Sequence, residues 1–299
     1  MLVFLGYLVV ILTVFGGHAL AGGELGALFQ PTELLIIGGA GVGAFLVGNN
    51  AKALKSTLRT LPALFKSSAY TKALYMDLIG MMYLLLSKSR QNGMMSLEKD
   101  IEDPHNSTIF SAYPRLMADS VLMNFVIDYL RLMLSGNMSA FEIESLMDEE
   151  IETCEHEHEV PANSLNSVGD ALPAFGIVAA VMGVVNALAS ADRPAAELGE
   201  LIAHAMVGTF LGILLAYGFI LPLASLLRQK SSEQIKMLQC IKVTLLSSLN
   251  GYAPQIAVEF GRKTLFTTER PSFNELEEHV RQVKSATLSN NNTSSDSTS

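Results

Sequence analysis

The fold is decided by two apolar stretches, ALPAFGIVAAVMGVVNALA at residues 171–189 and LIAHAMVGTFLGILLAYGFILPLASLL at residues 201–227. A helix needs about 20 apolar residues to cross a bilayer core of roughly 30 Å. Two further stretches, Leu2–Ala21 and the shorter, glycine-rich Glu33–Val47, share this character. We therefore predict an all-α, polytopic membrane protein with four transmembrane helices and a helical cytoplasmic domain.

The composition agrees with a membrane protein and excludes some partners. Only 16% of the residues are charged and the mean hydropathy is +0.34, whereas roughly a quarter of the residues in soluble domains are charged. The net charge of -9 argues against nucleic acid as a partner. Cys154 and Cys240 fall in predicted cytoplasmic segments, where a disulfide framework is not expected.

The basic residues predict the orientation. Of the 20 Lys and Arg residues, all but Arg193 lie between Asn50 and Val168 or from Arg228 onward. Because Lys and Arg gather on the cytoplasmic side, we predict that both termini are cytoplasmic. An alternative reading of Leu2–Ala21 as a signal peptide lacks the positively charged start that such peptides carry.

These segments predict five parts of the chain. The expected parts are a first transmembrane hairpin (1–49), a cytoplasmic helical domain (50–168), a second transmembrane hairpin (169–227), a cytoplasmic C-terminal helical region (228–284) and a disordered tail (285–299). Apolar residues spaced by three and four predict cytoplasmic helices over Thr71–Arg90 and Ala118–Leu134.

Two prolines are candidates for functional kinks in the third and fourth spans. Pro173 and Pro222 both lie toward the cytoplasmic face, and each would free the carbonyl four residues earlier if its helix continued. Pro173 has an alternative, purely structural explanation as a proline in the first turn of a helix that begins after Asp170. Pro222 lies deeper in its helix and is the better candidate.

The fourth span carries small and polar residues that predict close packing. Gly208, Gly212 and Ala216 form a small-residue ridge, and Gly39 with Gly43 forms a GxxxG pair in the second span. Thr209 lies beside the ridge, and its hydroxyl has the alternative of bonding to its own helix. Tyr217 is a candidate packing residue whose hydroxyl is satisfied by another helix.

Other signals are weak. The run from Cys154 to Glu159 lacks zinc spacing, and an acidic solvated face is the default reading. The glycines near Gly41 do not complete a dinucleotide fingerprint. No carboxylate lies in the middle of a span, since Glu33, Asp170 and Glu200 all occupy span ends. An ion pathway would therefore need a partner's carboxylate.

Long collinear segments resemble the MotA family of flagellar motor stator proteins. The segments are PANSLNSVGDALPAFGIVAAVMGVV, RPAAELGELIAHAMVGTFLGILLAYGFILPLASLLRQKS, LGYLVVILTVFGG, SRQNGMMSLEKDIEDP and NGYAPQIAVEFGRKTLF. The similarity covers the chain except about its last fifteen residues. It implies a multi-pass protein of the bacterial inner membrane that needs no cofactor or metal and carries out no enzymatic chemistry.

The resemblance also implies partners and site residues. Pro173 and Pro222 match the family's functional prolines, and Arg90 with Glu98 match charges that face the rotor protein FliG, although ordinary surface charge is their bland reading. Family members form a ring, expected to have five copies, around a MotB dimer that brings the ion-carrying aspartate. Sodium-driven relatives look as though they use hydroxyl residues on both the third and fourth spans. Here Thr209 is paired with Ala180, which favours protons.

Two other functions stay open from the sequence. The related TolQ and ExbB proteins are channel-like scaffolds that energise outer-membrane processes, and they usually have three spans. An assembly or anchoring protein would show no proton leak with a MotB-type partner, even after removal of the partner's periplasmic plug. Rotation direction and the regulation of channel opening are not predictable from the residues.

Overall fold

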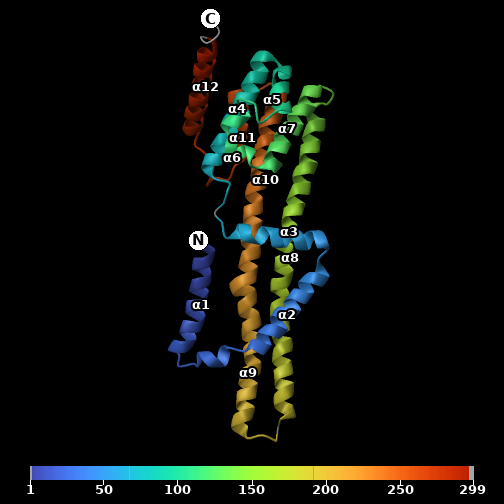
Figure 1. The fold of residues 1–299 in the computed structure, drawn as a ribbon, viewed down its shortest axis with the longest axis vertical. Helices are drawn as coiled ribbons and strands as arrows, with labels where there is room; N and C mark the ends of the chain where they lie inside the picture. The colour runs from blue at the N-terminus through green and yellow to red at the C-terminus, as the bar shows by residue number, and fades with distance from the viewer. Residues whose placement is uncertain (1, 67, 191, 296–299) are drawn as a thin grey trace. The chain divides into compact units, whose positions relative to one another are not determined.

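The computed structural model describes residues 2–66, 68–190 and 192–295, with side chains up to residue 285. All regular secondary structure in these ranges is helical, which confirms the predicted all-α class (Figure 1). The chain forms two compact units, one from residues 1–67 and 156–231 and the other from residues 68–155 and 232–299. Two long helices, α8 and α10, contribute to both units.

The first unit contains the apolar helices. Among the described residues, four helical stretches are long and apolar enough to cross a membrane, as predicted. The helices of this unit are α1 (Leu2–Leu20), η1 (Leu25–Leu28), α2 (Pro31–Gly48), α3 (Ala51–Leu64), the later part of α8 (Ala140–Ala189), α9 (Ala195–Ile213), the π-helix η4 (Leu214–Ile220) and the start of α10 (Leu221–Leu249).

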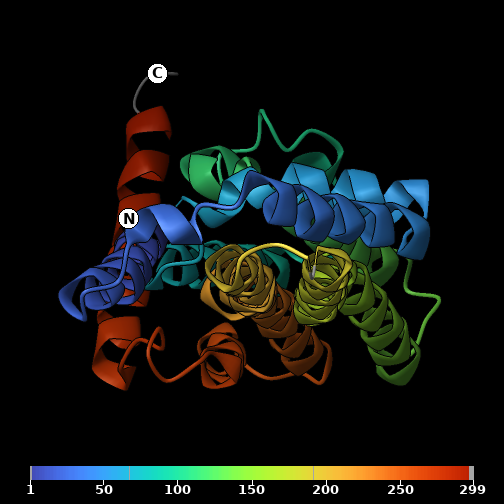
Figure 2. The same cartoon turned by 90° about the horizontal axis from the view of Figure 1, so that it is seen from below.

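The later part of α8 runs antiparallel to α9 and lies beside it, and α2 crosses both helices (Figures 1 and 2). Their common core contains Ile37 from α2, Leu172 and Ala179 from α8, and Val207 and Leu211 from α9. A short connection joins α8 to α9, where the Arg193 amide donates to the Ser190 carbonyl at 2.9 Å. This pair corresponds to the third and fourth predicted spans.

Helix α3 lies across α8 and α10 and is amphipathic (Figure 1). The Asn50 side chain caps its start by accepting from the Ala53 amide at 2.9 Å. At its end, Lys230 Nζ donates to the Ala63 carbonyl at 2.7 Å and to the Lys66 carbonyl at 2.6 Å. A cation thus satisfies carbonyls that a helix C-terminus leaves without intrahelical donors.

The second unit is built from segments far apart in the sequence. One core cluster joins residues of α4, α7, the start of α8, α10 and α11. The helices of this unit are α4 (Lys72–Asn92), η2 (Met94–Leu97), α5 (Glu98–Glu102), η3 (Phe110–Ala112), α6 (Pro114–Met117), α7 (Ser120–Ser135), α11 (Pro254–Thr264), α12 (Phe273–Ser295) and the remaining parts of α8 and α10.

The two predicted cytoplasmic helices are present as α4 and α7, and polar caps set their limits. The Thr71 side chain accepts from the Leu74 amide at 3.4 Å, and the Asp119 side chain accepts from the Leu122 amide at 3.2 Å. Helix α7 ends at Gly136, whose φ of 64° lies in the left-handed region that glycine tolerates. Local sequence signals therefore determine these boundaries.

Helix α12 begins with a reciprocal cap. The Ser272 amide donates to Glu275 Oε2 at 2.6 Å, while the Glu275 amide donates to Ser272 Oγ at 3.2 Å. Lys72 of α4 adds an ion pair to Glu275 at 2.7 Å. Helix α12 continues to Ser295, into the segment predicted to be a disordered tail, and residues 296–299 lie outside the described residues.

Candidate functional site

The first candidate site is the contact between α8 and α9, where small residues let the two backbones meet. A methyl group on Gly176 would lie 2.8 Å from the Gly208 carbonyl oxygen, and one on Gly212 would lie 2.7 Å from the Leu172 carbonyl oxygen. The predicted ridge at Gly208 and Gly212 therefore packs tightly against a neighbour. The sequence analysis missed its counterpart on α8, Gly176, and also the contact of Gly183 with Ala205.

Pro173 lies inside α8, which begins at Ala140 and continues to Ala189. The first-turn alternative is therefore wrong, and the Gly169 carbonyl four residues earlier loses its usual donor. A methyl on Gly169 would lie 2.5 Å from Leu221 Cδ2, and Leu221 directly precedes Pro222. The structure thus brings the neighbourhoods of the two prolines together.

Pro222 is the second residue after the π-helix η4, which ends at Ile220 and interrupts the fourth span. Such turns recur at functional sites because they break the regular i to i+4 hydrogen-bond ladder. Helix α1 contacts this turn: the Tyr7 hydroxyl donates to the Phe219 carbonyl at 3.1 Å, and the two rings lie 4.9 Å apart. Val10 of α1 approaches Gly218. No residue pattern had indicated the π-helix.

Thr209 and Ala180 lie at the same level of the α8–α9 pair. A methyl on Gly208 would lie 3.2 Å from the Ala180 amide nitrogen, and one on Gly176 would lie 3.4 Å from Thr209 Cα. The Thr209 hydroxyl makes no hydrogen bond with any described residue, so the predicted alternative of a bond to its own helix is absent. Tyr217 is 63% exposed and no described residue bonds its hydroxyl, so its bond to another helix stays a prediction.

The GxxxG prediction for the second span is wrong within this chain. A methyl on Gly39 or Gly43 would meet no described atom within 4 Å, whereas one on Gly41 would lie 3.0 Å from Leu172 Cδ2. The buried residues of α2 are Glu33, Ile37 and Gly41, which are four residues apart and share one face. Gly39 and Gly43 point to the other side of the helix.

Glu33 lies at a span end, as predicted, but its side chain is buried. Its side chain is in the first turn of α2, yet the residue is only 8% exposed and Oε2 has no hydrogen-bond partner among the described residues. A methyl on Gly208 would lie 2.7 Å from Oε2, so the carboxyl group lies against the small-residue ridge of α9. The apolar residues around Glu33 in the sequence gave no sign of this contact.

The second candidate site is the corner that follows α4. Gly93 turns the chain with φ of 82°, after which η2 and α5 follow. Arg90 in the last turn of α4 is exposed and its Nη1 donates to the Gly251 carbonyl at 3.4 Å. Glu98, the first residue of α5, is also exposed. Both candidate charges are therefore accessible on the second unit.

An ion pair between the partly exposed Lys88 and the buried Asp100, which the sequence analysis missed, holds this corner. Lys88 Nζ lies 2.6 Å from Asp100 Oδ2, and Ser107 Oγ donates to Asp100 Oδ1 at 2.7 Å. Asp100 is 5% exposed, so losing either partner would leave its charge buried and incompletely compensated. The sequence carries no local signal for this arrangement. Lys88 and Asp100 lie in different helices, and Ser107 lies in the loop that follows.

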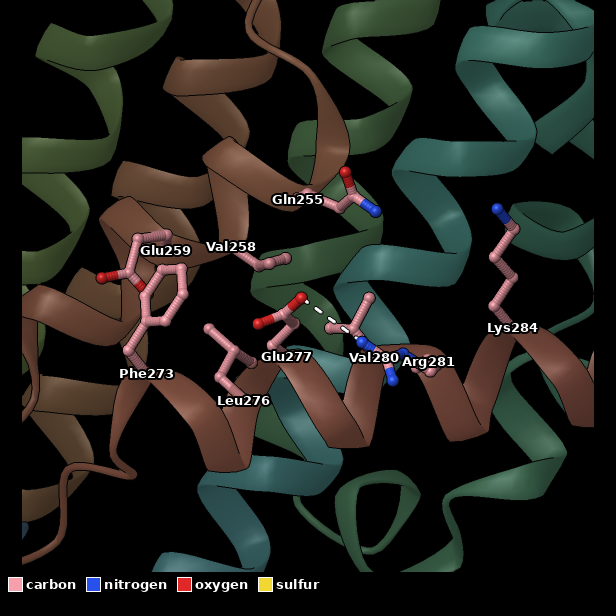
Figure 3. Close-up of a pocket in the computed structure, with 9 residues that line it drawn as sticks. All are labelled: Gln255, Val258, Glu259, Phe273, Leu276, Glu277, Val280, Arg281 and Lys284. Carbon is pink, nitrogen blue, oxygen red and sulfur yellow. Dashed lines mark hydrogen bonds and ion pairs between the residues drawn. The ribbon is translucent and has the colours of Figure 1, made fainter.

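Two cavities lie in the second unit. One of about 380 Å³ is lined by Ser89, Arg90, Met94, Met133, Leu249 and Tyr252. Another, of about 390 Å³, lies between α11 and α12, where Glu277 and Arg281 form an ion pair at 3.5 Å (Figure 3). The first cavity adjoins a predicted site residue, and the second contains none.

Comparison with known proteins gives the family. A model described as "Motility protein A N-terminal" matches residues 4–93, and one for the "MotA/TolQ/ExbB proton channel family" matches residues 117–240. The chain is 72% identical to Motility protein A of Salmonella typhimurium over 284 residues, which cover 95% of this chain and 96% of that protein. The chain belongs to the motility protein A family. As a member, it is a stator subunit of the flagellar motor with a proton-channel role.

Solved structures agree with the fold of this motility protein A. The flagellar MotAB stator complex from Bacillus subtilis matches with a TM-score of 0.70 and 27% identity, covering 92% of this chain and 97% of that chain. The C. jejuni MotAB structure matches in fold with a TM-score of 0.74 and 21% identity, covering 91% of this chain and 98% of that chain. Together with the four apolar helices, the family indicates a multi-pass inner-membrane protein.

Proposed function

We propose that several copies of this chain surround a MotB dimer and couple proton flow to torque on the rotor, with five copies expected. The incomplete burial of the apolar helices supports an assembly in the lipid bilayer. At most 28% of any candidate span's most apolar window is buried within the chain. Met206 and Tyr217 on the fourth span are 69% and 63% exposed. Neighbouring copies, the partner helices and lipid would cover these faces.

The α8–α9 pair is the proposed wall of the ion pathway. Neither residues 171–189 nor residues 201–227 contain a carboxylate, so an aspartate of MotB would carry the proton. Ala180 and Thr209 would face this region, and the single hydroxyl at their level favours protons over sodium. Moving one charge through the membrane potential provides roughly 2.3 kcal/mol per 100 mV.

The prolines and the π-helix are the proposed conformational elements. Pro173 and Pro222 weaken the helical ladders of α8 and of the fourth span at neighbouring places, through the contact of Gly169 with Leu221. Protonation of the partner's aspartate would shift the tightly packed α8–α9 pair. That shift would reach the cytoplasmic segments, where Arg90 and Glu98 would act on FliG.

The basic residues support the proposed topology. Lys52, Lys55 and Arg59 are exposed on amphipathic α3, as expected of a helix at the cytoplasmic surface of a membrane. Arg228 and Lys230 follow the fourth span. Both termini would therefore be cytoplasmic, and the α1–α2 and α8–α9 connections would face the periplasm.

Motility tests these assignments. We expect Pro173→Ala and Arg90→Ala each to reduce swimming strongly in cells that still assemble flagella, because one alters the α8 ladder and the other removes a rotor-facing charge. Proton leak with a plug-deleted MotB separates the two: Pro173→Ala should reduce it and Arg90→Ala should not. Normal swimming in both variants would contradict the site assignments, and absence of wild-type leak would contradict the channel role.

A further inference from the structure

Glu33 is a buried carboxyl group that the proposed mechanism does not use. It is 8% exposed, and Oε2 has no partner among the described residues. By contrast, buried Asp100 has both a lysine and a serine partner. An unpaired ionised carboxylate in an apolar environment is costly, so such a group takes up a proton or another positive charge.

Glu33 lies beside the α8–α9 pair, the proposed wall of the ion pathway. Its Oε2 lies against Gly208 of α9, next to Thr209, while Ala179 and Ala180 of α8 pack on the same glycine. Gly208 lies about 7 residues after Leu201, where the predicted fourth span begins, which is about 10 Å along the helix. Although Glu33 is near the start of α2, its carboxyl group therefore lies well within the length of the fourth span.

The surroundings contain few other titratable groups. Residues 171–189 of α8 contain none, and on α9 the nearest along the helix are His204 and Glu200. Glu200, His204 and Gly208 are spaced by four and share one face of α9. His204 Nε2 lies 4.0 Å from Glu200 Oε1. In the proposed topology, this face leads from the outer end of α9 to the Glu33 carboxyl group.

Gly208 makes the contact possible. Any side chain at this position would occupy the place of Oε2, because even a methyl group would come within 2.7 Å of it. The missing side chain thus lets a carboxyl group reach the backbone of α9. A carboxyl group in this position is a functional candidate, since ionisable residues within spans are costly and are usually retained for transport.

We propose that Glu33 is a proton-binding station in the outer half of the pathway. Its carboxylate accepts one proton from the external side on Oε2 and becomes a carboxylic acid. It then donates that proton to the aspartate of the partner and returns to the carboxylate, so one proton enters and one leaves. This inference rests on the proposed function, because it assigns the step before protonation of the partner.

Proton leak tests the proposal without requiring rotation. Cells would express the chain with plug-deleted MotB, and a pH-sensitive fluorescent protein would report cytoplasmic acidification after an external acid step. We expect Glu33→Gln, which keeps the size and a hydrogen-bond donor but cannot titrate, to reduce the leak at least about tenfold. Glu33→Asp should retain part of the leak. Glu24→Gln, at an exposed carboxylate on the same side, is the matched control and should match wild type.

Each outcome is decisive. A leak through Glu33→Gln equal to that of wild type would overturn the role of Glu33 alone, while absence of leak in the wild-type complex would overturn the proposed function as well. Co-purification with MotB reports assembly. If Glu33→Gln does not assemble with MotB, infrared spectra recorded during external acidification test the proposal instead. A protonated-carboxyl signal that grows with acidification of the wild-type complex and shifts in frequency in Glu33→Asp supports the proposal, and a signal that does not change with acidification or with this substitution overturns it.

Discussion

Glu33 and Asp100 are both buried carboxylates, but their surroundings give them different roles. Asp100 accepts from Lys88 and Ser107, so its charge is compensated and it holds the corner after α4. Glu33 has no such partner among the described residues. Burial alone does not distinguish a structural from a functional carboxylate, whereas the hydrogen-bond partners do.

A third carboxylate, Glu275, links stability to pH. The hydrogen bond from Lys72, followed by those from the Ser272 amide and hydroxyl, lowers the pKa of Glu275 from 4.5 to about 2. Because the folded pKa is depressed, the contribution to stability is present above about pH 4.5. It is lost as the pH falls toward about 2. We expect hydrogen exchange at the start of α12 to accelerate across this window.

The variant Glu275→Gln separates this effect from general acid unfolding. At pH 6 it should already show the faster exchange of α12, because the ion pair with Lys72 is lost while the cap to Ser272 can still form. Glu278→Gln, at an exposed residue of the same helix, is the control and should exchange like wild type. Equal exchange in all three proteins would contradict a role of the ion pair in docking α12.

At the scale of elements, the α8–α9 pair depends on glycine backbones. A methyl on Gly176 would lie 2.8 Å from a carbonyl oxygen and 3.1 Å from Gly212 Cα. These atoms belong to the backbone and cannot rotate away. We expect Gly176→Ala to destabilise the pair by about 1–3 kcal/mol and to reduce motility, which thermal unfolding of the purified stator complex and swimming assays would measure.

The matched control is Gly199→Ala on α9, where a methyl would meet no described atom within 4 Å. Alanine is also the better helix former, so this variant should be as stable as wild type. If both substitutions had the same effect, helix propensity rather than close packing would explain it. A stable and motile Gly176→Ala variant would contradict the tight α8–α9 contact.

The helices also differ in how well the sequence predicts them. Apolar composition predicted the four spans, and three- and four-residue spacing with polar caps predicted α4 and α7. The π-helix at Leu214–Ile220 and the uninterrupted course of α8 through Pro161 and Pro173 had no such signal. Whether a proline ends a helix or lies within one depends on the neighbours that stabilise the helix around it.

At the scale of the whole molecule, the chain is one part of a motor complex, and the coupling ion is a property of that complex. Ala180 packs against Gly208, the neighbour of Thr209, so this pair of positions carries one hydroxyl. We expect swimming speed to be unchanged when sodium is removed and to fall to zero when a proton uncoupler is added. Swimming that depends on sodium and resists the uncoupler would contradict proton coupling.

The sequence alone determined what local composition can encode. Apolar length predicted the spans, the distribution of Lys and Arg predicted the proposed orientation, and collinear resemblance indicated the family and the candidate prolines Pro173 and Pro222. These features depend on neighbours along the chain and on the two solvents, water and lipid. They therefore need no knowledge of which helices meet.

Only the tertiary structure decided which residues meet across helices. It placed the burial of α2 at Gly41 rather than at Gly39 and Gly43, joined Gly169 to Leu221, and brought the Glu33 carboxyl group to Gly208. Such contacts depend on the rotation and tilt of each helix, which small differences in packing set and which no periodicity in an almost uniformly apolar span reveals. For this reason a carboxylate expected at a span end became the strongest new candidate for proton transfer.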